Sequence, residues 1–245
     1  MEPARAIAQD ASRGDSQNVP DDPELAKRDS DGPYCYYLQR RVSAPLSRVL
    51  ARHLRPSTVT GLDLLMGLLA AWLLWRGHWL SGVAMIQLFG VFSCVDGEVA
   101  RLRRESSSIG DFFDTMTDRV TELMVILALT CSLATTLSAQ QAWPTGLMLL
   151  GGVWLLTLSS EKFRSSYRMN YPKRRLEPVF AFVCAGSDVR LLVLSIGVLA
   201  AALSQDATIL LWTFWGLAAV TYVNFVVRVI QIARHYRTFA ASIRP

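Results

Sequence analysis

The chain has 245 residues, of which 51% are hydrophobic, and it carries a formal net charge of +5 at pH 7. A positive net charge can indicate a nucleic-acid-binding protein, but the basic residues here stand beside long apolar runs. We therefore exclude nucleic acid as a partner and expect a membrane protein. The mean hydropathy of +0.27 is modest for that class because the first 33 residues are polar.

Residues 1–33 contain Pro, Asp, Ser, Arg and Lys but few large apolar side chains. Such a segment cannot bury a hydrophobic core, so we expect a disordered tail. Residues 34–245 form the second predicted unit, a membrane domain. Its first segment, Tyr34–Leu54, places apolar residues at roughly helical spacing with arginines between them. This pattern predicts an amphipathic helix on the inner membrane surface.

Six apolar stretches follow, and each is long enough, or nearly so, to cross a bilayer as a helix. They lie near residues 57–75, 80–102, 110–135, 145–168, 189–204 and 208–233, and the fifth is the shortest. The sequence therefore predicts an all-α polytopic membrane protein. It would have six transmembrane helices preceded by the amphipathic helix.

The basic residues between these stretches predict the orientation of the chain. Arginines and lysines concentrate in the loops after the second and fourth stretches and in the C-terminal segment. The loops on the opposite side carry only Arg76. Because basic loops tend to stay in the cytoplasm, we expect both termini to be cytoplasmic.

Acidic and small residues recur at fixed spacing across the second and third stretches. The pattern runs Asp96-Gly97-x-x-Ala100-Arg101, then eight residues to Gly110, then Asp114 and Asp118. Residues three, four or seven apart share one face of a helix, so the two acidic faces can meet across the short loop between the stretches. A carboxylate inside a membrane is costly and indicates a functional site. Clustered carboxylates suit Mg²⁺ or Mn²⁺, which also bridge phosphates.

This pattern resembles the signature of the CDP-alcohol phosphatidyltransferase family. Its membrane enzymes use the hydroxyl of one alcohol to displace CMP from a CDP-linked alcohol. Asp96–Leu102 is similar to the branch of di-myo-inositol-phosphate-phosphate synthases, and Ser187–Arg190 resembles the Asp-x-Arg segment of members that use phosphorylated inositol. Pro56–Thr60 is similar to the start of the family's first helix. The resemblance implies a homodimer, and we expect it in a bacterial or archaeal cytoplasmic membrane.

The resemblance also implies roles for single residues. Asp96, Asp114 and Asp118 would hold the metal ion, and Asp118 would also take the proton from the acceptor hydroxyl. The nucleotide and its phosphates would contact Thr60, Gly97, Ala100, Arg101 and Gly110.

Basic residues near the ends of the fourth and fifth stretches are candidates for the acceptor site, because arginine can bind phosphate through two parallel hydrogen bonds. They are Lys162, Arg164, Arg168 and Arg190. The basic residues after the fourth stretch also have an explanation that needs no ligand, because loops rich in lysine and arginine tend to stay on the cytoplasmic side of the membrane.

Ser93 departs from the family pattern, which carries a further aspartate three residues before Asp96. Serine is neutral and a poor ligand for Mg²⁺. Asp63 lies about seven residues inside the first stretch, at a depth similar to that of Asp96, by the helical rise per residue. We hypothesise that Asp63 supplies the missing charge. Asp111 is a second candidate ligand and lies nearer the surface.

The predicted function is the metal-dependent transfer of a phospho-alcohol group from a CDP-alcohol to an acceptor alcohol, with release of CMP. An inositol phosphate is one candidate acceptor, and membrane lipid is a partner, so the reaction belongs to phospholipid or polyol-phosphodiester synthesis. Two alternatives stay open. Ser93 favours a non-catalytic relative that binds nucleotide or metal, and buried acids also occur in cation transporters.

Overall fold

The computed structural model describes residues 34–241, and the expected tail, 1–33, lies outside them. Ten helical elements and no strands occur in this part of the chain. They are η1 (Cys35–Gln39), α2 (Arg40–Leu50), α3 (Pro56–Trp75), α4 (Trp79–Leu102), α5 (Ser108–Thr136), α6 (Ala139–Tyr167), α7 (Lys173–Leu176), α8 (Pro178–Val183), α9 (Ser187–Ser204) and α10 (Thr208–Ala241).

Six of these helices, α3, α4, α5, α6, α9 and α10, are long and apolar enough to cross a membrane. The six predicted spans are thereby confirmed, and the fifth is the shortest, as expected. The largest error in a helix start is at α6, which begins six residues earlier than predicted. The cause is local: the Ser138 hydroxyl accepts a hydrogen bond from the Gln141 backbone N–H at 3.3 Å and caps the helix there.

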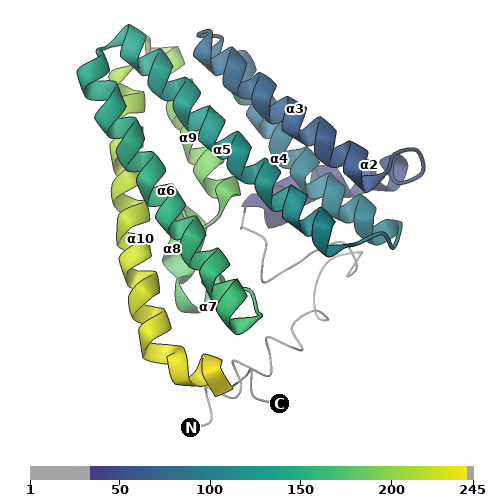
Figure 1. Cartoon of the computed structure of the whole chain (residues 1–245). Coiled ribbons are helices and arrows are strands. Elements are labelled where there is room, and N and C mark those ends of the chain that lie inside the picture. Colours follow the sequence, from purple (N-terminus) through teal and green to yellow (C-terminus); the bar gives the residue numbers. More distant parts are fainter. Residues whose placement is uncertain (1–33, 242–245) are drawn as a thin grey trace.

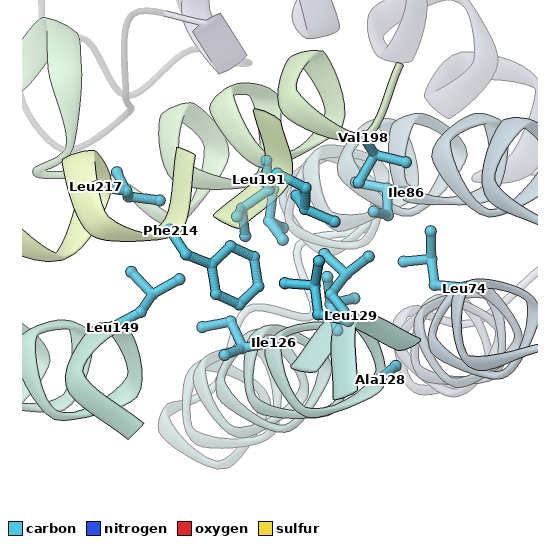
Figure 2. Close-up of a cluster of buried hydrophobic side chains, with 14 of the residues drawn as sticks. Leu74, Ile86, Ile126, Ala128, Leu129, Leu149, Leu191, Val198, Phe214 and Leu217 are labelled. Carbon is cyan, nitrogen blue, oxygen red and sulfur yellow. The ribbon is translucent and has the colours of Figure 1, made fainter. Parts of the chain in front are cut away.

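The six spans form one bundle (Figure 1). Helices α6 and α10 lie side by side on one flank and α3 and α4 on the other, with α5 and α9 between them. Buried apolar side chains from all six spans meet in one cluster. Figure 2 shows part of this cluster, which includes Ile126 of α5, Leu149 of α6 and Phe214 of α10.

Close glycine–threonine contacts join the spans. At four positions a Cβ added to a glycine would collide with a threonine on the neighbouring helix. The pairs are Gly67–Thr121 (α3/α5), Gly146–Thr130 (α6/α5), Gly152–Thr221 (α6/α10) and Gly197–Thr213 (α9/α10). Because lipid provides little hydrophobic drive for helix association, small residues that allow close packing carry much of it.

The N-terminal helix is held to the bundle by its polar face. Arg40, Ser43 and Ser47 donate hydrogen bonds of 2.7, 2.8 and 2.6 Å to the carboxylate of Glu98 on α4, which is fully buried. The apolar side chains Val42 and Val49 are more than half exposed. Helix α2 therefore has one polar and one apolar side, as an interfacial amphipathic helix does.

Candidate active site

The acidic pattern lies where α3, α4 and α5 meet. Asp96 stands near the end of α4, and Asp114 and Asp118 stand near the start of α5. The loop between these helices is short because Ser107 caps α5: its hydroxyl accepts a hydrogen bond from the Gly110 backbone N–H at 3.2 Å. Helix α3 packs against both α4 and α5. The prediction that the two acidic faces share one region therefore agrees with the packing of these helices.

Asp96 is held by two donors on the inner side of this region. It accepts a hydrogen bond of 3.0 Å from the Thr60 hydroxyl and another from the Gly97 backbone N–H. Its exposed fraction is 4%. Thr60, which we expected beside the nucleotide, thus also fixes the orientation of this carboxylate.

Asp118 accepts hydrogen bonds from two serines. The Ser93 hydroxyl on α4 donates at 3.1 Å, and the Ser187 hydroxyl at the start of α9 donates at 3.4 Å. A carboxylate at position 93 could not donate this bond and would face Asp118 with a like charge. With Ser93 at this position, Asp118 gains a hydrogen-bond donor. An aspartate at position 93 would instead repel Asp118 unless a cation lay between the two carboxylates.

A pocket of about 600 Å³ opens between the start of α3, the end of α4 and the start of α5. It contains every residue predicted to contact the nucleotide: Thr60, Gly97, Ala100, Arg101 and Gly110. Asp96 and Asp114 also line it, together with apolar side chains such as Leu64 and Phe113. We refer to it as the donor pocket.

A second pocket of about 350 Å³ lies on the other side of the acidic residues. Its lining includes Ser93, Asp118 and Ser187, and six basic side chains, Arg40, Arg101, Arg119, Arg164, Lys173 and Arg190. We refer to it as the basic pocket. The two pockets share Gly97, Arg101, Asp111 and Asp114, so the residues of the acidic pattern form the wall between them.

The four candidate acceptor residues fall in different places. Arg164 lines the basic pocket and forms an ion pair with Asp111, and both side chains are partly exposed. Arg190 also lines it but is 2% exposed. Lys162 and Arg168 are exposed and are not among the described residues that line either pocket.

Arg190 is engaged by protein groups. Its guanidinium donates two hydrogen bonds to Glu122, at 2.6 and 2.9 Å, and one to the Cys184 backbone carbonyl at 2.8 Å. Arg119 pairs with the same carboxylate at 2.9 Å. Glu122 therefore joins α5 to α9 through Arg190, a residue that lines the basic pocket.

Sequence reasoning missed two parts of the basic pocket. Lys173 lies on α7, a four-residue helix without any periodic pattern to predict it. The other part is the N-terminal segment: Tyr34, Cys35 and Arg40 line the pocket, and the Cys35 backbone N–H donates to Asp188 at 3.0 Å. The helix expected on the membrane surface thus also closes one side of this pocket.

The acidic region offers the oxygen donors that Mg²⁺ and Mn²⁺ prefer. Within residues 34–241, no three acidic, thiol or imidazole groups are close enough to hold an ion as they stand. Asp63, however, is buried with both carboxylate oxygens free of any hydrogen-bond partner. Two carboxylate oxygens without a partner, in a region that also carries Asp96, Asp114 and Asp118, fit a divalent cation, which these four aspartates would hold.

Comparison with known proteins finds relatives of this chain. The chain is 32% identical over 144 residues to a bifunctional IPC transferase and DIPP synthase of Rubrobacter xylanophilus. The matched residues cover 59% of this chain and 31% of that protein. A protein of the same name from Thermococcus kodakarensis is 26% identical over 141 residues, covering 58% and 32%. The chain thus spans about a third of the length of these curated relatives.

Solved structures show the same fold. The apo form of phosphatidylinositol phosphate synthase (PgsA1) from Mycobacterium tuberculosis matches with a TM-score of 0.65 at 20% identity, covering 82% of this chain and 99% of that one. The same protein with CDP-DAG bound matches with a TM-score of 0.57 at 19% identity, covering 84% and 98%. Its complex with manganese and citrate gives 0.56 at 19%, covering 83% and 92%.

The sequence model of the CDP-alcohol phosphatidyltransferase family matches residues 53–223. This range is more than half of the chain, and it includes the whole acidic pattern from Asp96 to Asp118. The chain belongs to the CDP-alcohol phosphatidyltransferase family.

Proposed function

We propose that this chain transfers a phospho-alcohol group from a CDP-alcohol to the hydroxyl of an acceptor and releases CMP. One observation carries the proposal: two pockets of different chemistry share a wall made by Gly97, Arg101, Asp111 and Asp114. A donor in one pocket and an acceptor in the other would meet at that wall. A binding protein or a cation transporter needs no second, basic pocket.

The reaction would be an in-line displacement at the phosphorus that carries the alcohol. The acceptor oxygen forms a bond to this phosphorus while the bond from phosphorus to the CMP oxygen breaks. Asp118, at the boundary of the basic pocket, would take the proton of the acceptor hydroxyl, and Ser93 and Ser187 hold its carboxylate in place. Arg101 would bind the phosphates. A bound Mg²⁺ or Mn²⁺ would supply charge neutralisation for the pyrophosphate.

The acceptor that the basic pocket suits best is a phosphorylated polyol, such as an inositol phosphate. Arg119, Arg164 and Lys173 bring positive charge to one cavity. Arg190 would act by positioning Glu122 and α9, and Lys162 and Arg168 would contribute only to the charge of the rim. The names of the relatives and of the structural neighbour agree with this class of substrate.

Both termini would lie in the cytoplasm, and the membrane would be that of a bacterium or an archaeon. The enzyme would act as a homodimer. The manganese complex of the structural neighbour supports a divalent cation as cofactor.

The experiment is CMP release by the purified full chain in detergent with Mg²⁺ or Mn²⁺. CDP-diacylglycerol and CDP-inositol are each offered with inositol, inositol phosphate, glycerol phosphate or serine. We expect CMP only when metal and an inositol phosphate are both present. No CMP from any pair, with binding of CDP-diacylglycerol retained, would identify a non-catalytic relative instead, and metal uptake unaffected by nucleotide would identify a cation transporter.

Lys173 makes the acceptor site sensitive to pH. Burial lowers the pKa of Lys173 to about 8. The positive charges of Arg228, Arg119 and Arg190 lower this pKa as well, while the negative charge of Asp188 raises it. The amine is charged below this pKa and neutral above it, while an acceptor phosphate stays ionised throughout. We expect the KM for inositol phosphate to rise about tenfold between pH 7 and pH 9, since a charge-assisted hydrogen bond is lost.

The matched control is Lys173→Arg, which stays charged over this range. Its KM should change less than about twofold between pH 7 and pH 9. If wild type and Lys173→Arg show the same pH profile, Lys173 does not bind the acceptor phosphate.

A further inference from the structure

We propose that Asp63 takes over, from a different helix, the metal-binding role of the aspartate that the family signature carries at the position of Ser93. The proposal rests on the proposed function, because it assigns a ligand to the same metal site. It explains why a chain that belongs to the family can lack one acidic residue of the signature.

Asp63 is the buried acid without a partner in the described part of the chain. It lies in α3, its exposed fraction is 1%, and neither carboxylate oxygen accepts or donates a hydrogen bond. A buried polar group normally has a partner, and leaving one without a partner costs about 1–3 kcal/mol, with more for a charged group. Glu98 and Glu177 illustrate the normal case, because each is buried and each accepts several hydrogen bonds. Asp63 therefore points to a ligand that the protein atoms do not provide.

The packing of α3 on α5 directs Asp63 to the acidic region. Gly67 of α3 lies against Thr121 of α5 so closely that a Cβ at Gly67 would collide with the threonine. Asp63 is one turn before Gly67 on the same face, and Thr117 is one turn before Thr121. Asp63 thus faces the turn that carries Asp118, and the charges that act on it are those of Asp118, Asp96 and Asp114.

Ser93 and Asp63 share Asp118 as a neighbour. Ser93 reaches Asp118 from α4 through its hydroxyl, and Asp63 approaches it from α3. Replacing an aspartate by Ser93 removes one negative charge from this group, and Asp63 restores it, so the region again holds four carboxylates. Four carboxylates close together, two of them buried, repel one another unless divalent cations lie among them. The exchange preserves the charge that metal binding needs while it moves one ligand from α4 to α3.

The test measures metal binding directly, by the loss of the free Mn²⁺ electron paramagnetic resonance signal as the full chain in detergent is titrated. The variants are Asp63→Asn and the exchange variant, which combines Asp63→Asn with Ser93→Asp. Asp206→Asn is the matched control. Asp206 is an exposed aspartate in the loop between the end of α9 and the start of α10, where its carboxylate accepts a hydrogen bond from the Thr208 backbone N–H. Thermal unfolding with and without Mn²⁺ checks that each variant is folded.

We expect Asp63→Asn to weaken Mn²⁺ binding about 10- to 100-fold, in the range found for changes around metal ligands. The exchange variant should bind Mn²⁺ within about threefold of wild type, and Asp206→Asn should equal wild type. Mn²⁺ should raise the unfolding temperature of wild type and of the exchange variant but much less that of Asp63→Asn. Unchanged affinity in Asp63→Asn, or an exchange variant that folds and binds as weakly as Asp63→Asn, would overturn the proposal.

The result is separable from the fate of the proposed function. If wild type releases CMP with metal while Asp63→Asn binds Mn²⁺ as tightly as wild type, the function stands and the role of Asp63 is wrong. If Mn²⁺ binding depends on Asp63 but no donor and acceptor yield CMP, the metal site stands and the transferase proposal is wrong. Should Asp63→Asn alone fail to fold, Mn²⁺ binding by the folded exchange variant decides the question.

Discussion

Replacing Asp118 by Asn should reduce CMP release about 10³-fold or more. The carboxylate is the proposed base for the acceptor hydroxyl, and general base catalysis contributes about 10²–10⁴-fold. Its proposed role as a metal ligand adds to the loss. Asparagine keeps the shape of the side chain. Its amide oxygen can accept a hydrogen bond from one of the two serines, Ser93 or Ser187, and its amide nitrogen can donate to the hydroxyl oxygen of the other, so the fold should be retained. The measurement is CMP release in a single turnover at saturating donor, acceptor and Mg²⁺.

Asp206→Asn is again the control, since it makes the same chemical change away from both pockets. It should release CMP at the wild-type rate. Activity of Asp118→Asn within tenfold of wild type would exclude Asp118 as the base. A loss in which only KM for the acceptor rises would assign it to acceptor binding.

The second large effect concerns stability. Replacing Arg228 by Met should destabilise the protein by about 3–5 kcal/mol, the range for removal of one member of a buried ion pair. Arg228 on α10 is fully buried and donates to Glu177 at 2.9 Å, to the Ser160 hydroxyl at 2.7 Å and to the Leu156 carbonyl at 3.1 Å. The change leaves the charge of Glu177 buried without its partner. Unfolding in detergent, followed by circular dichroism, measures the loss.

The double variant Arg228→Met with Glu177→Gln separates the pair from the packing around it. Removing both charges avoids the uncompensated carboxylate, so the double variant should recover at least half of the lost stability. If it is as unstable as Arg228→Met alone, the buried charge of Glu177 is not the cause.

The six spans were predictable because each depends on a local property, a long apolar run, that the bilayer requires of any spanning helix. The acidic part of the donor pocket depends on a similarly local property. Asp96 and Asp114 lie on two adjacent helices joined by a short loop, so helical spacing predicts that they lie near each other, and both line the pocket.

The basic pocket was less predictable because tertiary contacts build it. Arg190 was expected to bind the acceptor, but it pairs with Glu122, which is 68 residues away in the sequence. Lys173 lies on a helix too short to leave a periodic pattern. The polar face of α2 packs on Glu98, and nothing in the sequence around Arg40 indicates that partner. Long-range polar contacts of this kind have no signature in a single sequence.

The most direct test of transfer from one pocket to the other follows the acceptor oxygen. Inositol phosphate labelled with ¹⁸O at its hydroxyls is incubated with CDP-diacylglycerol or CDP-inositol, Mg²⁺ and the full chain, and the products are analysed by mass spectrometry. Attack by the acceptor predicts a phosphodiester that contains the label in its new bond, together with unlabelled CMP. Transfer would be contradicted if CMP formed while the labelled acceptor stayed unchanged and a phosphomonoester with oxygen from water appeared. The donor would then only be hydrolysed.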